Sequence, residues 1–177
     1  MPFIEVHPLW KTYDSTIHIA DKKDLPDELY ELLEGKPETG YNKGFVTMVN
    51  PDTYREVFAL WDLEPAECTP FLKFAFGQFI FFHHNEYKIL DPVYNTISMA
   101  GKRDDLKFVM HILLSDEEGL KNAYFKSIYF SVVDKLGAPA PDECYAFVPA
   151  LGLGGAAKKG NVKKTKLITE LTILSQL

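Results

Sequence analysis

The sequence predicts an α+β fold in which an antiparallel β-meander packs against helices and the C-terminal half is helical. Short apolar runs follow one another in the middle of the chain, and gaps of only a few residues make neighbouring strands antiparallel. Apolar residues at helical spacing lie on both sides of this region. Aromatic residues make up 14% of the 177 residues, which supports a well-filled core.

The N-terminal part predicts a helix and then a strand. The helix covers residues 25–34, with Asp24 as its N-cap, acidic residues in its first turn and Gly35 after its end. Residues 40–44 begin and end with glycine and predict a turn. The apolar, β-branched run 45–49 predicts a strand.

A second helix is predicted over residues 51–61, because Asn50 is a good N-cap and proline suits the first helical position. Its apolar positions have helical spacing and are expected to be buried: Tyr54, Val57, Phe58 and Trp61. A linker over residues 64–69 leads to the meander. The predicted strands are 71–76, 78–83, 87–91 and 94–99. Because these runs are apolar on both faces, helices are expected to cover one side.

The last third is predicted to be mainly helical. A helix is expected from Asp104 to Leu114, and Ser115 is expected to cap a short one after it. A strong amphipathic stripe over residues 124–136 ends at Gly137. Beyond a basic linker with three lysines, apolar positions at helical spacing predict a final helix: Leu167, Leu171 and Leu174.

The segment 141–155, PDECYAFVPALGLGG, combines a short aromatic and branched run with a proline break and three glycines. Such a segment either cradles a ligand with its backbone or allows two elements to pack closely. A phosphate-binding Walker loop requires Lys and then Ser or Thr after its last glycine, and Ala156 and Ala157 stand there. The sequence therefore favours close packing or a mobile loop, which is expected to fix the final helix onto the 124–136 helix.

Length and composition indicate a globular chain with two regions in one compact unit. The predicted division is residues 1–100, which include the meander, and residues 101–177, the helical region. The two cysteines are far apart and match no metal spacing, so reduced thiols are expected. The first residues lack a signal-peptide pattern, and the longest apolar run is too short to cross a bilayer. We expect a cytoplasmic protein that does not bind membranes.

Candidate chemical groups each have a simpler structural explanation. His83 and His84 are adjacent at a strand end, so their side chains are expected on opposite faces, one buried and one exposed. His7, His18 and His111 show no acidic partner at useful spacing. Cys144 has no neighbouring base and is expected to be buried. Adjacent acidic pairs are explained by helix capping. The sequence predicts no catalytic residue, no cofactor and no metal site, and therefore no enzyme.

The net charge of −6 is unevenly distributed. Residues 1–70 contain 6 Lys and Arg against 14 Asp and Glu, whereas residues 71–177 contain 13 against 11. An acidic surface repels nucleic-acid phosphates and attracts basic proteins. The same charge also serves solubility alone. The chain is thus not expected to bind nucleic acid directly, and a basic protein partner is compatible with its charge.

The C-terminal part contains a distinctive set of residues: Leu136-Gly137, Pro139, Pro141–Tyr145, Phe147–Leu151, Leu153–Gly155, Asn161, Lys163-Lys164, Leu171 and Ile173–Leu177. With these residues it resembles the C-terminal domain of Tdi-type immunity proteins of the type VI secretion system. The N-terminal part resembles the GAD-like domain that usually precedes it. The matching residues there are Leu25-Pro26, Gly40-Tyr41, Gly44-Phe45, Val49–Pro51, Tyr54 and Trp61.

This resemblance implies an immunity protein that binds and neutralises a cognate secreted nuclease, a DNase toxin, in the cytoplasm. A DNA-binding toxin has a basic surface, so acidic residues are the expected contacts. The predicted partner-binding residues are Glu28, Glu31, Glu34, Asp142 and Glu143. The alternative is a non-enzymatic regulatory module that binds a small molecule or peptide near Gly152–Gly155. The sequence leaves the oligomeric state open.

Overall fold

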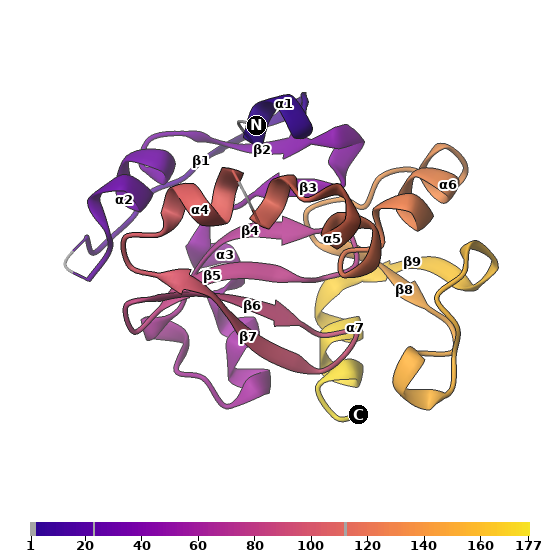
Figure 1. The fold of residues 1–177 in the computed structure, drawn as a ribbon. Coiled ribbons are helices and arrows are strands. Elements are labelled where there is room, and N and C mark those ends of the chain that lie inside the picture. The colour runs from indigo at the N-terminus through magenta and orange to yellow at the C-terminus, as the bar shows by residue number, and fades with distance from the viewer. Residues whose placement is uncertain (1–2, 23, 112) are drawn as a thin grey trace.

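A computed structural model describes residues 3–22, 24–111 and 113–177. Its main feature is a seven-stranded antiparallel sheet whose strands lie in chain order, β1 to β7 (Figure 1). The strands are β1 (Leu9–Thr16), β2 (Pro37–Tyr41), β3 (Val46–Met48), β4 (Thr69–Phe74), β5 (Phe79–His83), β6 (Glu86–Asp91) and β7 (Thr96–Lys102). The predicted meander is confirmed. The sheet is also larger than predicted, since it includes β1 and β2. These two strands were missed because their sequences have little of the apolar alternation that marks a strand.

Helices surround this sheet. They are α1 (Phe3–Val6), α2 (Asp27–Leu33), α3 (Pro51–Tyr54), α4 (Leu106–His111), α5 (Glu117–Asn122), α6 (Lys126–Leu136) and α7 (Leu167–Leu174). The predicted 51–61 helix starts as α3, where the Asn50 side chain accepts a hydrogen bond from the Asp52 N–H. It continues as the 3₁₀ helix Arg55–Trp61. Within the described residues, every helix is too short or too polar to span a bilayer.

Two predicted N-caps are wrong. Helix α2 begins at Asp27 and not at Leu25, and Pro26 stands at its cap position without a side-chain hydrogen bond. The reason is that a residue before proline avoids the helical conformation, so the helix begins only after Pro26. Helix α5 is capped by Asp116 rather than Ser115, because Ser115 still belongs to the preceding 3₁₀ turn.

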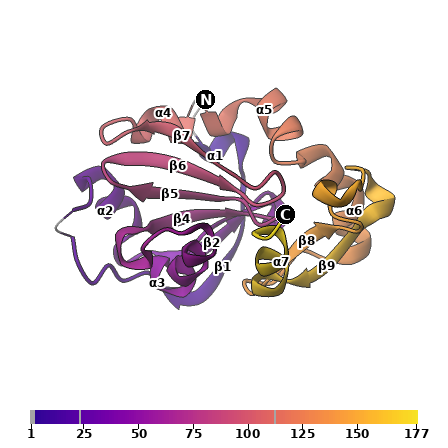
Figure 2. The same ribbon diagram turned by 90° about the horizontal axis from the view of Figure 1, so that it is seen from below.

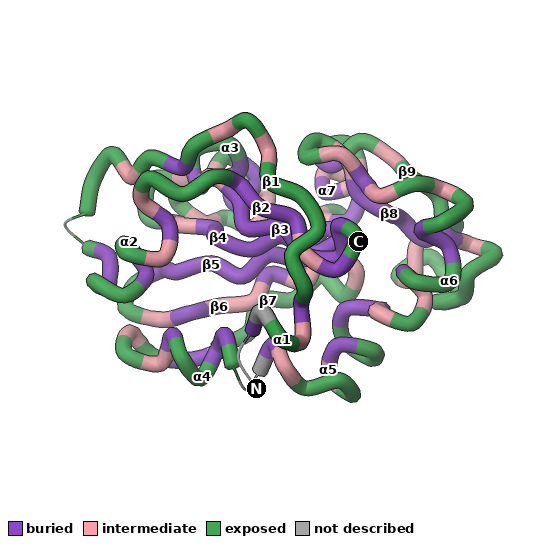
Figure 3. Tube along the Cα trace, turned by 90° about the horizontal axis from the view of Figure 1, so that it is seen from above, coloured by how far each residue is buried: buried purple, intermediate pink, exposed green. Residues whose placement is uncertain are grey.

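The central strands of the sheet are buried on both faces. Strand β5 is buried throughout, whereas most of β1 is exposed (Figure 3). Ile80 and Phe82 of β5 join the larger of two apolar cores, while Phe79 and Phe81 join the smaller one. Helices α4 and α5 cover the first face, and α3 and α7 lie on the second (Figure 2). The expectation that helices cover one side is therefore wrong, since successive strand residues alternate between two apolar faces.

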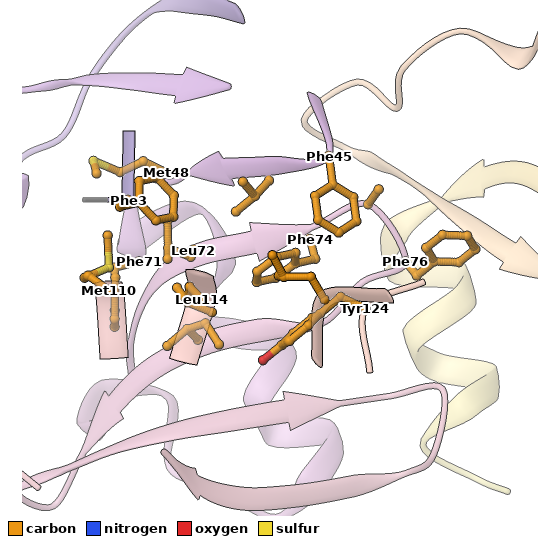
Figure 4. Close-up of a cluster of buried hydrophobic side chains, with 14 of the residues drawn as sticks. Phe3, Phe45, Met48, Phe71, Leu72, Phe74, Phe76, Met110, Leu114 and Tyr124 are labelled. Carbon is orange, nitrogen blue, oxygen red and sulfur yellow. The ribbon is translucent and has the colours of Figure 1, made fainter. Parts of the chain in front are cut away.

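Aromatic contacts fill the larger core. Phe74 of β4 stacks on Tyr124 with ring centroids 4.1 Å apart and meets Phe45 edge-on at 5.4 Å (Figure 4). This core contains residues from both sides of position 100, including Leu120 and Tyr145. The sheet and the C-terminal region therefore share apolar contacts. The division at residue 100 stays a prediction.

The C-terminal half is mainly helical, as predicted, but it also contains a β-hairpin. Strand β8 (Glu143–Phe147) contains the start of the aromatic and branched run in the PDECYAFVPALGLGG segment. It pairs antiparallel with β9 (Val162–Lys166), which was expected to be a basic linker. Only Val162 of β9 is buried, and its sequence, VKKTK, has no apolar alternation. The strand therefore gives no signal by which it could have been predicted.

The hairpin lies between the last two long helices. Tyr145 of β8 packs in the core that contains α6, whereas Cys144 packs in the core that contains α7. Adjacent residues of a strand face opposite sides, so the two helices occupy opposite sides of β8. The expectation that the final helix packs onto the 124–136 helix is therefore wrong.

Candidate partner-binding surface

An open groove lies beside helices α2 and α4 and has an acidic rim. Residues three and four positions apart share one face of a helix, so Glu28, Glu31 and Leu32 of α2 point the same way. All three line the groove, which has a volume of about 600 Å³. Its floor is apolar and comprises Leu32, Tyr41, Met48, Leu106 and Met110.

The rim carries charges of both signs with an excess of acid. Glu28 forms an ion pair with Lys107 of α4 at 3.3 Å, and both side chains are largely exposed. Glu31 is exposed on the same rim. Phe108, which follows Lys107, is 46% exposed and is one of few large aromatic side chains at the surface. Two of the five predicted contact residues are thus brought together beside apolar surface.

Glu34 lies on the other side of α2 and holds the chain locally. Its carboxylate accepts a hydrogen bond of 2.6 Å from the Ile19 N–H and contacts His18 Nδ1 at 3.3 Å. The Ile19 hydrogen bond is the main cause that lowers the pKa of Glu34. The expectation that His18 lacks an acidic partner is wrong, because folding brings two distant segments together.

Asp142 and Glu143 lie at the hairpin, at the opposite end of the molecule from α2 (Figure 1). Asp142 accepts a hydrogen bond from Lys166 Nζ at 2.6 Å, and this lowers its pKa. Glu143 accepts from the Ala140 N–H at 2.9 Å and lies 3.6 Å from Lys164 Nζ, which together lower its pKa. The five predicted acids therefore do not form one continuous surface.

A buried lysine next to this pair was not predicted. Lys73 of β4 is 5% exposed and donates hydrogen bonds to the carbonyls of Pro141 at 2.6 Å and Glu143 at 3.2 Å. Its ammonium also lies 5.4 Å from the centre of the Tyr54 ring. Burial lowers the pKa of Lys73 from 10.5 to about 8. The signal in the sequence is a single lysine inside the apolar run Phe71–Phe76.

Replacing this lysine is expected to change the pH dependence of stability. Between about pH 8 and pH 10.5 the unfolded chain keeps the Lys73 proton and the folded chain loses it. The unfolded state then binds more protons, so this group makes the folded state more stable as pH rises. The stability of wild type relative to Lys73→Met should therefore increase across this range, by at most about 3 kcal/mol. Urea unfolding of both proteins at several pH values measures the difference, and a constant difference contradicts the expectation.

The glycine-rich segment packs closely against itself. A Cβ on Gly155 would lie 2.8 Å from the Ala150 carbonyl oxygen and closer still to that of Pro149. The predicted close backbone packing is confirmed at this position. Gly152 lines a hollow of about 260 Å³ together with Tyr94 and Leu177, and Gly154 and Gly155 are not among its lining residues. Ligand binding at this segment stays a prediction.

Both cysteines are free, as expected, and the predicted burial of Cys144 is confirmed; Cys68 is buried as well. Burial raises the pKa of the Cys144 thiol to about 12, and that of Cys68 likewise to about 12. A thiol with such a pKa is protonated at neutral pH and is a poor nucleophile. The geometry therefore offers neither cysteine as a reactive group.

The two adjacent histidines differ in burial as predicted, but they do not point apart. His83 is buried and His84 is 62% exposed at its side chain. His84 begins the turn after β5 with a left-handed φ of 49°, which ends the strand alternation. The two rings stack with centroids 3.9 Å apart, and both lie near Glu67. The prediction of opposite faces is wrong because it assumed that the strand continues through His84.

One crystal structure has a fold similar to that of this chain. "Crystal structure of Atu4351 from Agrobacterium tumefaciens" superimposes with a TM-score of 0.71 over 98% of this chain and 86% of that chain. The sequences are 14% identical, so the likeness concerns the fold alone. No curated protein matches the chain.

A family model matches the C-terminal part. It does not extend to the residues before 108, where the GAD-like resemblance stays a prediction. The matched part includes α5, α6, the β8–β9 hairpin, the glycine-rich segment and α7. Residues 108–177 of this chain match the family described as T6SS immunity protein Tdi1, C-terminal.

Proposed function

We propose that this chain is a type VI secretion immunity protein that binds and neutralises a cognate secreted nuclease without catalysing a reaction. The observation that supports it best is the match of residues 108–177 to the Tdi1 C-terminal family. An immunity role requires a tight protein interface rather than an active site. The buried, protonated cysteines agree with such a role.

We place the main contact at the groove between α2 and α4. Stable interfaces combine an apolar centre with a polar rim, and their strongest contacts often involve aromatic residues. The groove has an apolar floor and acidic residues Glu28 and Glu31 on its rim. Exposed Phe108 is on α4, outside the lining of the groove. A nuclease presents a basic surface to DNA, so it is the partner whose charge complements this rim.

The remaining predicted contacts have a smaller part in this proposal. Glu34, Asp142 and Glu143 already accept hydrogen bonds within the chain. A partner's lysine or arginine would have to compete with those bonds, which reduces what the new contact adds. Glu28 pairs with Lys107, but both side chains of that pair are largely exposed and such a pair adds little. Of the acids that the sequence singled out, Glu28 and Glu31 therefore have the strongest claim to bind the partner.

The test is titration of the immunity protein into the nuclease encoded at the adjacent locus, with DNA cleavage and binding measured at low and moderate salt. We expect complete inhibition at an equimolar ratio and faster association at low salt, because charge steering is screened by ions. Absence of binding at both salt concentrations would contradict the proposed function.

A charge-reversal variant tests the surface separately. Glu28→Lys/Glu31→Lys should weaken binding by about tenfold or more at low salt, mainly through slower association. The matched control is Glu56→Lys/Glu118→Lys, which changes the net charge equally at exposed residues away from the groove. If both variants bind alike, the groove is not the contact even where the inhibition itself is observed.

A further inference from the structure

A second cluster of polar side chains does not line the groove of the proposed interface and is not explained by it. Glu67 ends the 3₁₀ turn Pro65–Glu67, His83 ends β5, and His84 begins the following turn. One ligand atom from each lies within 4.8 Å of the others. Two segments that are separate in the chain thus bring three ligand groups to one point.

The buried histidine points into this cluster without a partner. The His83 side chain is 7% exposed, and its Nε2 has no hydrogen-bond partner among the described residues. That nitrogen lies 3.7 Å from Glu67 Oε2, which is too far for a hydrogen bond. A buried polar atom without a partner costs free energy, so a ligand between His83 and Glu67 would stabilise the fold.

The geometry points to a site for a divalent transition metal ion, foremost Zn²⁺, held by Glu67, His83 and His84. Imidazole and carboxylate are ordinary zinc ligands, and neighbouring ligand atoms around a tetrahedral zinc are roughly 3.4 Å apart. The distances from Glu67 Oε2 to the Nε2 atoms of His84 and His83, 2.9 Å and 3.7 Å, lie on either side of this value. The exposed ring of His84 has room to turn toward the ion.

A cavity beside the three ligands leaves room for the fourth coordination position of the ion. Glu67 and His84 line a cavity of about 430 Å³, which Arg55 and Asn85 also line. Three protein ligands leave one coordination position of a tetrahedral ion open, and that position would face this cavity. Water or a small anion beside Arg55 would complete the coordination.

Lys88 has to adjust when the ion binds. Its ammonium lies 3.2 Å from His83 Nδ1 and 3.3 Å from Glu86. A histidine that binds metal through Nε2 carries its proton on Nδ1, and that proton repels an ammonium. Lys88 would therefore keep its ion pair with Glu86 and lose its contact with His83 Nδ1. Lys88→Gln, whose amide oxygen can accept the Nδ1–H, should bind the metal several-fold more tightly than wild type.

The experiment titrates ZnCl₂ into the tag-free full chain by calorimetry and records the electron paramagnetic resonance spectrum with Cu²⁺. We expect one ion per chain, two nitrogen ligands in the spectrum, and a higher unfolding temperature with Zn²⁺. Glu67→Gln and His84→Asn should each weaken binding by about tenfold or more. The matched control is His18→Asn, which removes an exposed histidine that also contacts a carboxylate, and it should bind as wild type does.

Two results would overturn the inference. One is a wild-type chain that binds no Zn²⁺ or binds it no more tightly than Glu67→Gln and His84→Asn. The other is a Cu²⁺ spectrum without two nitrogen ligands, or one that is unchanged in His84→Asn. None of these measurements involves the nuclease. They can therefore reject the metal site without bearing on the immunity function, and the nuclease assay can reject the immunity function without bearing on the metal site.

Discussion

Gly155→Ala is expected to destabilise the protein by about 3 kcal/mol or more. A Cβ at this position would lie 2.7 Å from the Pro149 carbonyl carbon and 2.8 Å from the Ala150 oxygen. Both are backbone atoms, so no side-chain rotation can relieve the overlap. The Gly155 N–H also donates to the Ala150 carbonyl at 3.0 Å, which holds the two segments together. The loop would have to open, and its contacts with β8 and α7 would change with it.

Thermal unfolding measures this loss. For a chain of this length, about 3 kcal/mol corresponds to a fall of roughly 6–12 °C in Tm. Gly160→Ala is the matched control, because a Cβ there meets nothing within 4 Å and its φ lies outside the left-handed region. Equal Tm values for the two variants would show that the segment is not closely packed at Gly155.

Phe76→Ala is expected to cost about 3–5 kcal/mol. Phe76 follows β4, is 1% exposed, and inserts among residues of the C-terminal region. Its ring stacks on Phe147 at 4.9 Å and meets Phe125 and Tyr145 edge-on at 5.2 Å and 5.7 Å. Removing the ring leaves a cavity where the sheet joins the hairpin and α6. The sheet and the C-terminal region should then hold together less firmly.

Urea unfolding of Phe76→Ala beside Phe108→Ala separates this effect from the loss of a phenylalanine as such. Phe108 is 46% exposed, and its replacement should change stability by no more than about 0.5 kcal/mol. Similar urea midpoints for both variants would contradict the expectation that Phe76 packs the sheet against the C-terminal region. The Phe108 variant also bears on the proposed interface, because it should bind the nuclease less tightly while remaining folded.

Local patterns were sufficient where the signal is short-range. Asn50 and Pro51 start a helix through a side-chain cap and a fixed φ, and Gly137 ends one with a positive φ of 73°. The strands of the meander follow from dense apolar residues and short gaps. Predictions were wrong where the pattern in the sequence is weak. Strand β9 was missed because only one of its residues is buried, and the start of α2 was misplaced because it depends on the conformation imposed before Pro26.

The candidate sites depend mainly on contacts between distant segments. Helical spacing predicts that Glu28 and Glu31 share a face, but only folding places α4 beside them to form the groove. Strand alternation predicts that His83 and His84 point apart, and a single left-handed residue reverses this. Glu67 reaches them from another element. Such distances are set by turns and sheet register, which residue spacing does not encode.

Residue patterns along the chain were enough to predict the α+β class, the meander, the main helices and the burial of Cys144. Each of these depends on composition or on spacing along a few residues. Three features came from long-range contacts instead: helices cover both faces of the sheet, the β8–β9 hairpin lies between α6 and α7, and Lys73 is buried beneath Pro141 and Glu143. These features bring together residues that are far apart in the chain, and their free energy comes from shared apolar cores and buried hydrogen bonds.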